Sequence, residues 1–155
     1  MLSAEIITTS HKLPAWIDTG VNYYCKLLSP YLKLNINNIS PSQGSLDKIQ
    51  KQKKETDLIR KKITPNNLVI MLDEKGKNYS SVELAAAFKK WQLNYSGFTF
   101  IIGPADGLGD NIKKEADQLL SLSHLTFTHD MALVILLEQI YRCIAINNNH
   151  PYHRS

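Results

Sequence analysis

The chain has 155 residues, 43% of them apolar, and seven glycines. This is the size of one globular domain with a core large enough to fold alone, and two domains would be cramped, so we expect a single domain over residues 1–155. The net charge of +4 and the sequence pI of about 9.0 are compatible with a polyanionic partner such as nucleic acid. Many proteins without such a partner are equally basic.

Neither a metal site nor a membrane segment is indicated. Cys25 and Cys143 fit no CxxC or Cys/His spacing, so we expect reduced core cysteines in an intracellular protein. The N-terminus lacks a basic region followed by an apolar run, and the one long apolar stretch contains Glu138 and Arg142. We therefore expect no signal peptide and no membrane span, and the cytoplasm is the expected location.

Apolar segments of strand length alternate with segments of helical pattern along the chain. In chain order, the pattern predicts a strand over Leu2–Thr8, a helix over Trp16–Leu28, a strand over Lys33–Ile39, a charged helix capped by Ser45 and ending near Lys62, a strand over Leu68–Leu72 followed by a turn-like DEKGKN, a helix from Ser80 or Ser81 through Trp91, a strand over Phe98–Ile102, and a short helix near Asp110–Gln118. Continuous apolar strands, each followed by a helix, predict an α/β fold with a mostly parallel sheet and helices on both faces.

The last part of the chain has an unusual composition. Leu122–Thr128 alternates apolar residues with hydroxyl or imidazole residues, as a short strand or a binding loop does, and Asp130 is a plausible N-cap for the next helix. Met131–Ile146 is apolar on nearly every face, interrupted only by Glu138, Gln139 and Arg142. Such a helix should be buried all round, which in a small domain predicts a homodimer.

Ligands of a parallel α/β sheet bind at the carboxyl ends of the strands. The loops that matter are therefore those after Leu72, over Gly103–Gly109 and around Leu122–Phe127. Glycines after a strand are typical of a phosphate-binding loop. The turn lacks both GxGxxG and a Gly-Lys-Ser/Thr ending, so an ordinary strand-to-helix turn explains it equally well.

Several short motifs occur in a fixed order: LDEKGK at Leu72–Lys77, IGPADGL at Ile102–Leu108, LSLSHLTFTH around Ser121, EQIYRCI at Glu138–Ile144, and the ending HPYHRS. Together they resemble the RlmH family of SPOUT methyltransferases, which modify a pseudouridine in bacterial large-subunit ribosomal RNA, over essentially the whole chain. The resemblance implies a C-terminal trefoil knot within the α/β fold, an S-adenosylmethionine site inside the knot, and an obligate homodimer.

The resemblance also implies the cofactor-binding residues: Leu72, Gly103, Leu122, Ser123, His124, Leu125, Thr126 and Phe127. Apolar side chains and backbone groups at strand ends suit an adenine, and a glycine keeps a Cβ out of the ligand's path. The chain departs from the family pattern at Ile102–Gly107, where relatives commonly read IGGPEG, and at Thr128–Asp130, where they read PHP. Because Pro104 has no amide hydrogen to donate, Gly103 is a better candidate than residue 104 for a backbone contact with the cofactor.

For the chemistry, the residues and the resemblance both indicate Arg142, Tyr152, His153 and Arg154. Methyl transfer from a sulfonium is an in-line displacement, so the protein must align the reactants and remove the acceptor's proton. A neutral histidine or tyrosine can take the N3 proton of pseudouridine, and an arginine can stabilise the developing charge or hold a phosphate. The alternative for Arg142 is an ion pair with Glu138 one helical turn earlier.

The remaining histidines and aromatic residues have ordinary interpretations. We expect a structural or cofactor-loop role for His129, and loop positions for His11 and His150. Trp16, Tyr23 and Tyr24 have the spacing of core residues rather than of base-stacking residues.

The charged helix over Lys48–Lys62 is either a solvated face or a surface that follows RNA phosphates. Three functions are open. The first is an S-adenosylmethionine-dependent enzyme that methylates N3 of a pseudouridine in 23S ribosomal RNA, with the large-subunit RNA or the assembled ribosome as partner. The others are a related knotted methyltransferase with a different RNA target, and a non-catalytic knotted dimer that binds RNA or the ribosome.

Overall fold

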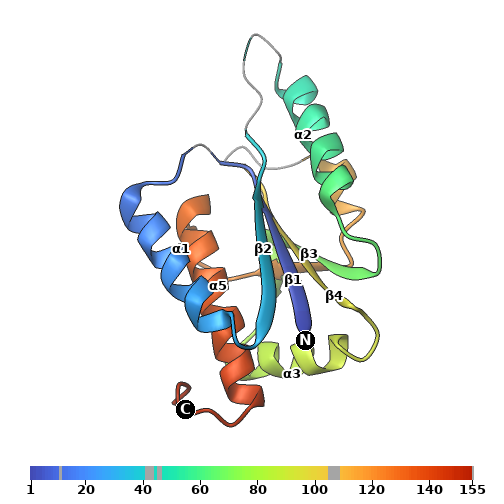
Figure 1. Cartoon of the computed structure of the whole chain (residues 1–155). Coiled ribbons are helices and arrows are strands. Elements are labelled where there is room, and N and C mark those ends of the chain that lie inside the picture. Colours follow the sequence, from blue (N-terminus) through green and yellow to red (C-terminus); the bar gives the residue numbers. More distant parts are fainter. Residues whose placement is uncertain (11, 41–43, 45–46, 105–108, 155) are drawn as a thin grey trace.

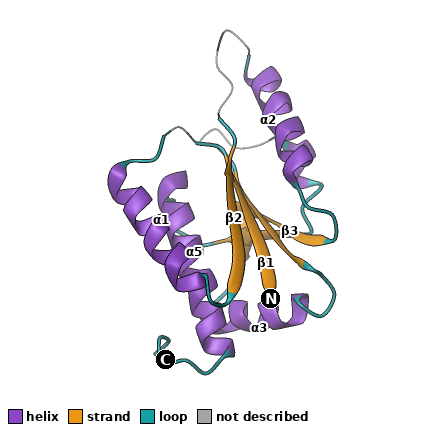
Figure 2. Cartoon of the chain, in the orientation of Figure 1, coloured by secondary structure: helices purple, strands orange, loops and turns teal. Residues whose placement is uncertain are grey.

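A five-stranded sheet lies at the centre of the molecule, in a computed structural model that describes residues 1–10, 12–40, 44, 47–104 and 109–154 (Figures 1 and 2). In chain order the elements are β1 (Leu2–Thr8), α1 (Ala15–Leu28), β2 (Leu32–Asn38), α2 (Lys48–Lys62), β3 (Asn67–Asn78), α3 (Ser81–Trp91), β4 (Gly97–Ile102), α4 (Asp110–Lys113), β5 (Gln118–Ser121) and α5 (His129–Asn147). The strand order is β2-β1-β4-β3-β5, and every neighbouring pair is parallel.

Helices cover both faces of this sheet, as the alternating pattern predicted. Figure 1 shows α1 and α5 on one side and α2 on the other. Successive strand residues point to opposite faces, so Ile6 packs in the core beneath α1, α3 and α5, whereas Ile7 packs with Ile59 of α2 and Ile112 of α4. The central strand β4 is buried at every residue. The predicted α/β class is therefore confirmed.

The edge of the sheet around β5 differs from the sequence prediction. The segment Asp73–Asn78, predicted as a turn, continues β3, and its register with β5 shifts between Leu72 and Lys77. A Cβ on Gly76 would stand 2.6 Å from the carbonyl carbon of Leu119 in β5. The glycine that suggested a turn thus permits a close approach of two backbones.

The same strand replaces part of a predicted helix. The helix expected over Asp110–Gln118 ends at Lys113, and β5 begins at Gln118. A four-residue strand is too short to show a periodicity of its own, because its pairing partner lies far away in the sequence. The segment Leu122–Thr128, predicted as a strand or a loop, is a loop between β5 and α5.

Two helix starts also differ from the prediction. The N-cap of α2 is Asp47, whose side chain accepts a hydrogen bond from the Gln50 amide in a capping box; Ser45 lies outside the described residues, as does His11. The N-cap of α5 is Thr128 and not Asp130, because the Thr128 hydroxyl accepts from the Met131 amide. Ser80 caps α3, in agreement with the sequence.

Side chains predicted to be buried on α1 are partly exposed. Trp16 is 66% exposed and Tyr23 58% exposed, so the core interpretation is wrong for both, whereas Tyr24 is half-buried against the core. The buried face of α1 carries Ile17 and Val21 instead, and Trp16 and Tyr23 lie on its outer side.

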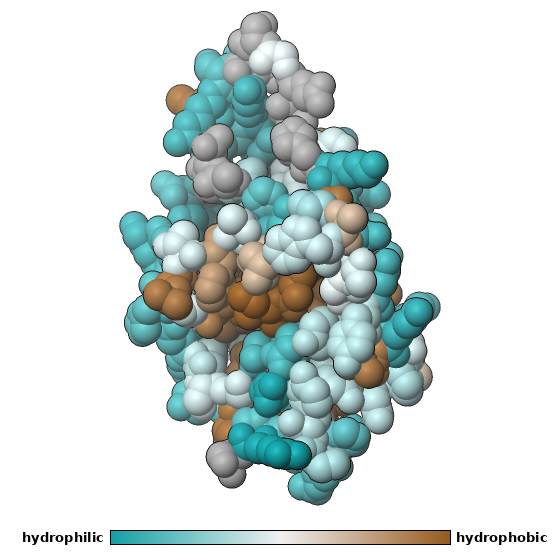
Figure 3. All heavy atoms as spheres, turned by 90° about the vertical axis from the view of Figure 1, so that its left-hand side faces the viewer, coloured by the Kyte–Doolittle hydropathy of each residue, from teal (hydrophilic) through white to brown (hydrophobic). Residues whose placement is uncertain are grey.

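The long apolar helix α5 is not covered on every side within one chain. It packs between α1 and α3, and Met131, Val134 and Ile135 are only half-buried, so one subunit alone does not provide the complete burial that was predicted together with a homodimer. Figure 3, which shows the face on the α1 side of Figure 1, has apolar side chains gathered in its middle. Of the two free cysteines, Cys143 is buried and Cys25 half-buried. No helix among the described residues is long and apolar enough to cross a membrane.

Candidate functional site: a cavity and a tail cluster

A cavity of roughly 330 Å³ lies beyond the ends of β4 and β5 and beside residues 71–74 in the middle of β3. Its walls include seven of the eight residues predicted to bind the cofactor: Leu72, Gly103, Leu122, Ser123, Leu125, Thr126 and Phe127. The eighth, His124, is exposed and does not line the cavity. The parallel topology therefore brings together three segments that are far apart in the sequence.

Hydroxyl groups shape the loop after β5. The Ser121 hydroxyl donates to the carbonyl of Ser123 at 3.0 Å, and the Ser123 hydroxyl accepts from the Leu125 amide at 3.0 Å. Thr128 then caps α5, so that His129 and Ala132 of its first turn also line the cavity. The alternating pattern of this segment thus reflects a loop held by its own side chains.

Two charged side chains at the cavity rim were missed by the sequence analysis. Lys113 Nζ lies 3.0 Å from Asp73 Oδ2, and Glu74 stands next to them. Burial opposes ionisation of Asp73, but the Lys75 amide and the Lys113 ammonium bind its carboxylate, and the net effect lowers the pKa of Asp73. The hydrogen bond that the Lys113 ammonium donates to Asp73 raises the pKa of Lys113. Asp73 directly follows Leu72 in LDEKGK and could have been found there; Lys113 had no such signal.

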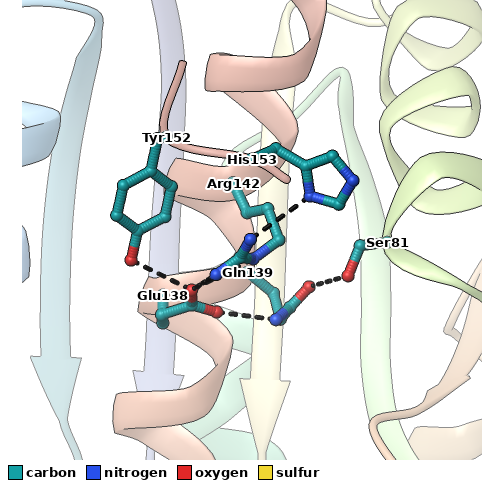
Figure 4. Close-up of polar contacts among 6 residues, drawn as sticks. All are labelled: Ser81, Glu138, Gln139, Arg142, Tyr152 and His153. Carbon is teal, nitrogen blue, oxygen red and sulfur yellow. Dashed lines mark hydrogen bonds and ion pairs between the residues drawn. The ribbon is translucent and has the colours of Figure 1, made fainter. Parts of the chain in front are cut away.

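A second group of polar residues lies on the C-terminal half of α5 and the tail (Figure 4). Arg142 donates to Glu138 Oε1 through Nη2 at 2.6 Å and Nε at 3.1 Å, and the Tyr152 hydroxyl donates to the same oxygen at 3.1 Å. The Arg142 guanidinium also lies 4.8 Å from the centre of the Tyr152 ring, and His153 Nδ1 lies 3.2 Å from Arg142 Nη1. The tail therefore folds back onto α5.

These contacts decide the protonation of the cluster. The ion pair of Arg142 with Glu138, which was the alternative interpretation of Arg142, is present, and its hydrogen bond raises the pKa of Arg142. Burial, together with the nearby Glu138 carboxylate, raises the pKa of Tyr152, so its hydroxyl stays protonated. A guanidinium can only donate, so His153 Nδ1 accepts, and a neutral His153 ring carries its proton on Nε2.

The residue types and the motif resemblance indicated one group of Arg142, Tyr152, His153 and Arg154. The first three do lie together, whereas Arg154 is exposed. Glu138, the common acceptor, was identified only as an alternative partner for Arg142. It could have been found as one of the few polar residues inside an apolar helix.

The cavity and the tail cluster do not meet within one chain. Ala132 lines the cavity, and Arg142 lies ten residues further along the same helix, which is about 15 Å. None of the tail residues of the cluster lines the cavity.

A family model described as "Predicted SPOUT methyltransferase" matches residues 2–153. The chain belongs to this family. It is therefore a methyltransferase, and an enzyme of this class needs a methyl donor.

Curated relatives match over nearly their full length. One, named "Ribosomal RNA large subunit methyltransferase H", from Paraburkholderia xenovorans (strain LB400), is 38% identical over 155 residues, covering 99% of each chain. Another of the same name, from Herminiimonas arsenicoxydans, is 40% identical over 151 residues, covering 96% of this chain and 97% of that one.

A solved structure supports the fold alone. It is "The structure of a probable methylase family protein from Haemophilus influenzae Rd KW20", with a TM-score of 0.55 and 14% identity, and it covers 99% of this chain and 70% of that chain. The trefoil knot stays a prediction.

Proposed function

We propose that this methyltransferase uses S-adenosylmethionine to methylate N3 of a pseudouridine in 23S ribosomal RNA. The observation that carries the proposal is the cavity beyond β4 and β5, which is lined by seven of the eight residues that the motif resemblance implied. The names of the curated relatives support ribosomal RNA of the large subunit as substrate. Such a substrate also fits the expected cytoplasmic location.

The cavity suits the proposed cofactor. Its volume of roughly 330 Å³ lies within the range of small-ligand sites, about 300–1,000 Å³. Leu72, Leu122 and Phe127 offer apolar walls for an adenine, and the rim pair Asp73–Lys113 offers both signs of charge to an amino-acid group. When bound, S-adenosylmethionine supplies a methyl group that is activated by its sulfonium.

The tail cluster suits the acceptor side of the reaction. Arg142 can stabilise the negative charge that develops on the carbonyls flanking N3, and the protonated Tyr152 hydroxyl acts as a hydrogen-bond donor rather than a base. His153 is the proposed proton acceptor, once Arg142 turns from His153 Nδ1 towards the RNA. The exposed Arg154 is placed to bind a phosphate.

We further propose that the active site forms in a homodimer, with the tail of one subunit at the cavity of the other. Methyl transfer needs the reacting atoms about 3–3.5 Å apart, whereas cavity and cluster are separated along α5 within one chain. The half-buried apolar side chains of α5 and the apolar area in Figure 3 support a second subunit at this face.

The substrate is held, in this proposal, by the positive side of α2. Arg60 is engaged by Asp57 at 3.5 Å and Glu115 at 2.6 Å. Lys51, Lys54 and Lys61 recur at helical spacing along one side of α2, with no ion pair to a described carboxylate. Such a row suits the phosphates of an RNA chain.

Mass spectrometry of 23S ribosomal RNA from a deletion strain tests the proposed function. Loss of one methylated pseudouridine, restored by the gene, is the expected result. An unchanged ribosomal RNA would contradict the proposal. Methylation of another RNA by the purified protein would then favour the related enzyme, and absence of S-adenosylmethionine binding in calorimetry would favour the non-catalytic dimer.

A further inference from the structure

Glu138 is the acceptor on which the tail cluster converges. Its Oε1 receives the Arg142 guanidinium and the Tyr152 hydroxyl, and its Oε2 receives the Gln139 amide at 2.6 Å. The Glu138 side chain is only 18% exposed. Both oxygens are therefore used by groups of this chain, which leaves Glu138 poorly suited to take a proton from the substrate.

The same carboxylate is itself held from outside the tail. Gln139 turns its amide nitrogen to Glu138 and accepts from the Ser81 hydroxyl at 2.7 Å (Figure 4). Ser81 is the first residue of α3, and α3 packs along α5. A chain of hydrogen bonds thus runs from α3 through Gln139 and Glu138 to the tail.

The negative charge of Glu138 determines how the side chains of Arg142 and Tyr152 are oriented. Arg142 and Tyr152 both present donors, and among the described residues Glu138 is the acid that the two share. The Tyr152 ring also packs on Tyr141, with ring centres 4.7 Å apart, but an aromatic contact alone leaves the hydroxyl undirected.

We propose that Glu138 is a positioning residue. Its carboxylate fixes the Arg142 guanidinium and the Tyr152 hydroxyl relative to each other, and its hydrogen bond with Gln139 ties the C-terminal tail to α3. It touches neither methyl donor nor acceptor. The proposal rests on the proposed function insofar as Arg142 and Tyr152 act on the RNA.

The substitution Glu138→Gln tests this with little change of shape. Arg142 and Tyr152 lose the negative charge of their shared acceptor, and one oxygen becomes an NH2 donor that either faces Arg142 and Tyr152 or requires the Gln139 amide to turn over and change its contact with Ser81. We expect kcat for ribosomal RNA to fall about 100-fold, the scale of a misplaced reacting group, with unchanged calorimetric affinity for S-adenosylmethionine. The matched control is Glu83→Gln, an exposed glutamate in the first turn of α3, which should retain the wild-type kcat. A Glu138→Gln variant with the control's kcat would overturn the proposal.

A double-mutant cycle separates positioning from general damage. If Glu138 acts through the tail, Glu138→Gln should cost much less kcat in a Tyr152→Phe background than in the wild type. Fully additive losses would contradict the proposal. If Glu138→Gln fails to fold, Ser81→Ala is the alternative variant, because it removes only the hydrogen bond from Ser81 to Gln139. This variant should show a smaller loss of kcat than Glu138→Gln, and an unchanged kcat would contradict a positioning role for this series of hydrogen bonds.

A readout independent of activity tests the holding of the tail. We expect carboxypeptidase to digest the C-terminus of the Glu138→Gln protein faster than that of the wild type or of Glu83→Gln, because the tail has lost its acceptor. Equal digestion rates would overturn the proposal. If the wild-type protein does not methylate ribosomal RNA, the proposed function fails, while the digestion still decides whether Glu138 orders the tail.

Discussion

Gly103 follows β4 and lines the cavity, and it is the residue at which a single substitution tests the cofactor site most directly. We predict that Gly103→Val abolishes S-adenosylmethionine binding, because a branched side chain would occupy the space where the backbone approaches the ligand. Titration calorimetry measures the affinity, and circular dichroism checks that the variant is folded. Unchanged affinity in a folded variant would mean that the cofactor binds elsewhere.

Cys143 gives a prediction on stability at alkaline pH. Burial raises its pKa from 9.0 to about 12, so its thiol stays neutral in the folded chain at a pH where the unfolded chain has ionised. The contribution of the neutral thiol to the free energy of unfolding is fully present below pH 9. It falls by up to about 4 kcal/mol as the pH rises from about 9 to about 12. Denaturant titrations at successive pH values between pH 8 and pH 11 give the free energy of unfolding of the wild type and of Cys143→Ala, and so check this dependence. Parallel pH dependences of the two proteins would show that Cys143 does not contribute.

At the scale of an element, the C-terminal tail should be required for activity but not for folding. We predict that deleting residues 152–155 leaves folding and cofactor binding nearly unchanged and lowers methylation by at least about two orders of magnitude, the scale of losing a positioned acid–base or charge-stabilising group. Among the described residues of the deleted segment, Tyr152 is the one that packs against the core cluster, so the loss of stability should be small. Arg154→Ala alone should lose less activity if Arg154 only holds a phosphate. A truncated protein that methylates at the full rate would exclude the tail from the active site.

The helix α2 should govern binding of RNA rather than chemistry. We predict that replacing Lys51, Lys54 and Lys61 by glutamine raises KM for ribosomal RNA and leaves kcat unchanged. The slope of the logarithm of the binding constant against the logarithm of the salt concentration should become shallower by about 0.7–0.9 per lost phosphate contact. The control replaces three exposed lysines on other elements with the same loss of charge: Lys33, Lys89 and Lys90. Equal effects of the two triple variants would show that only net charge matters, and would leave α2 as a solvated face.

At the scale of the whole molecule, we predict a homodimer that covers the outer side of α5. An isolated subunit leaves the apolar side chains of Met131, Val134 and Ile135 only half-buried and therefore partly in contact with water. Analytical ultracentrifugation at micromolar concentration measures the mass. A folded monomer of 17.6 kDa under these conditions would contradict both the dimer and the shared active site.

Local patterns in the sequence determined the class of the fold and much of the candidate site. Continuous apolar runs such as Phe98–Ile102 are long enough to identify buried parallel strands, and Ser80 marks the start of α3 by its capping chemistry. Sheet topology predicted that the chain after Leu72, at Gly103 and around Leu122 would lie at one edge of the sheet, and the motif resemblance implied the individual candidate cofactor residues, seven of which line the cavity.

Tertiary structure alone decided the features that depend on partners distant in the sequence. The segment Asp73–Asn78 is a strand because β5 lies against it, and Trp16 is exposed because the opposite side of α1 faces the sheet. Glu138 became the centre of the tail cluster only when the chain beyond α5 folded back and brought Tyr152 to it. The separation of cavity and cluster likewise follows from the length of a rigid helix, since a sequence motif records which residues are present but not how far apart a helix holds them.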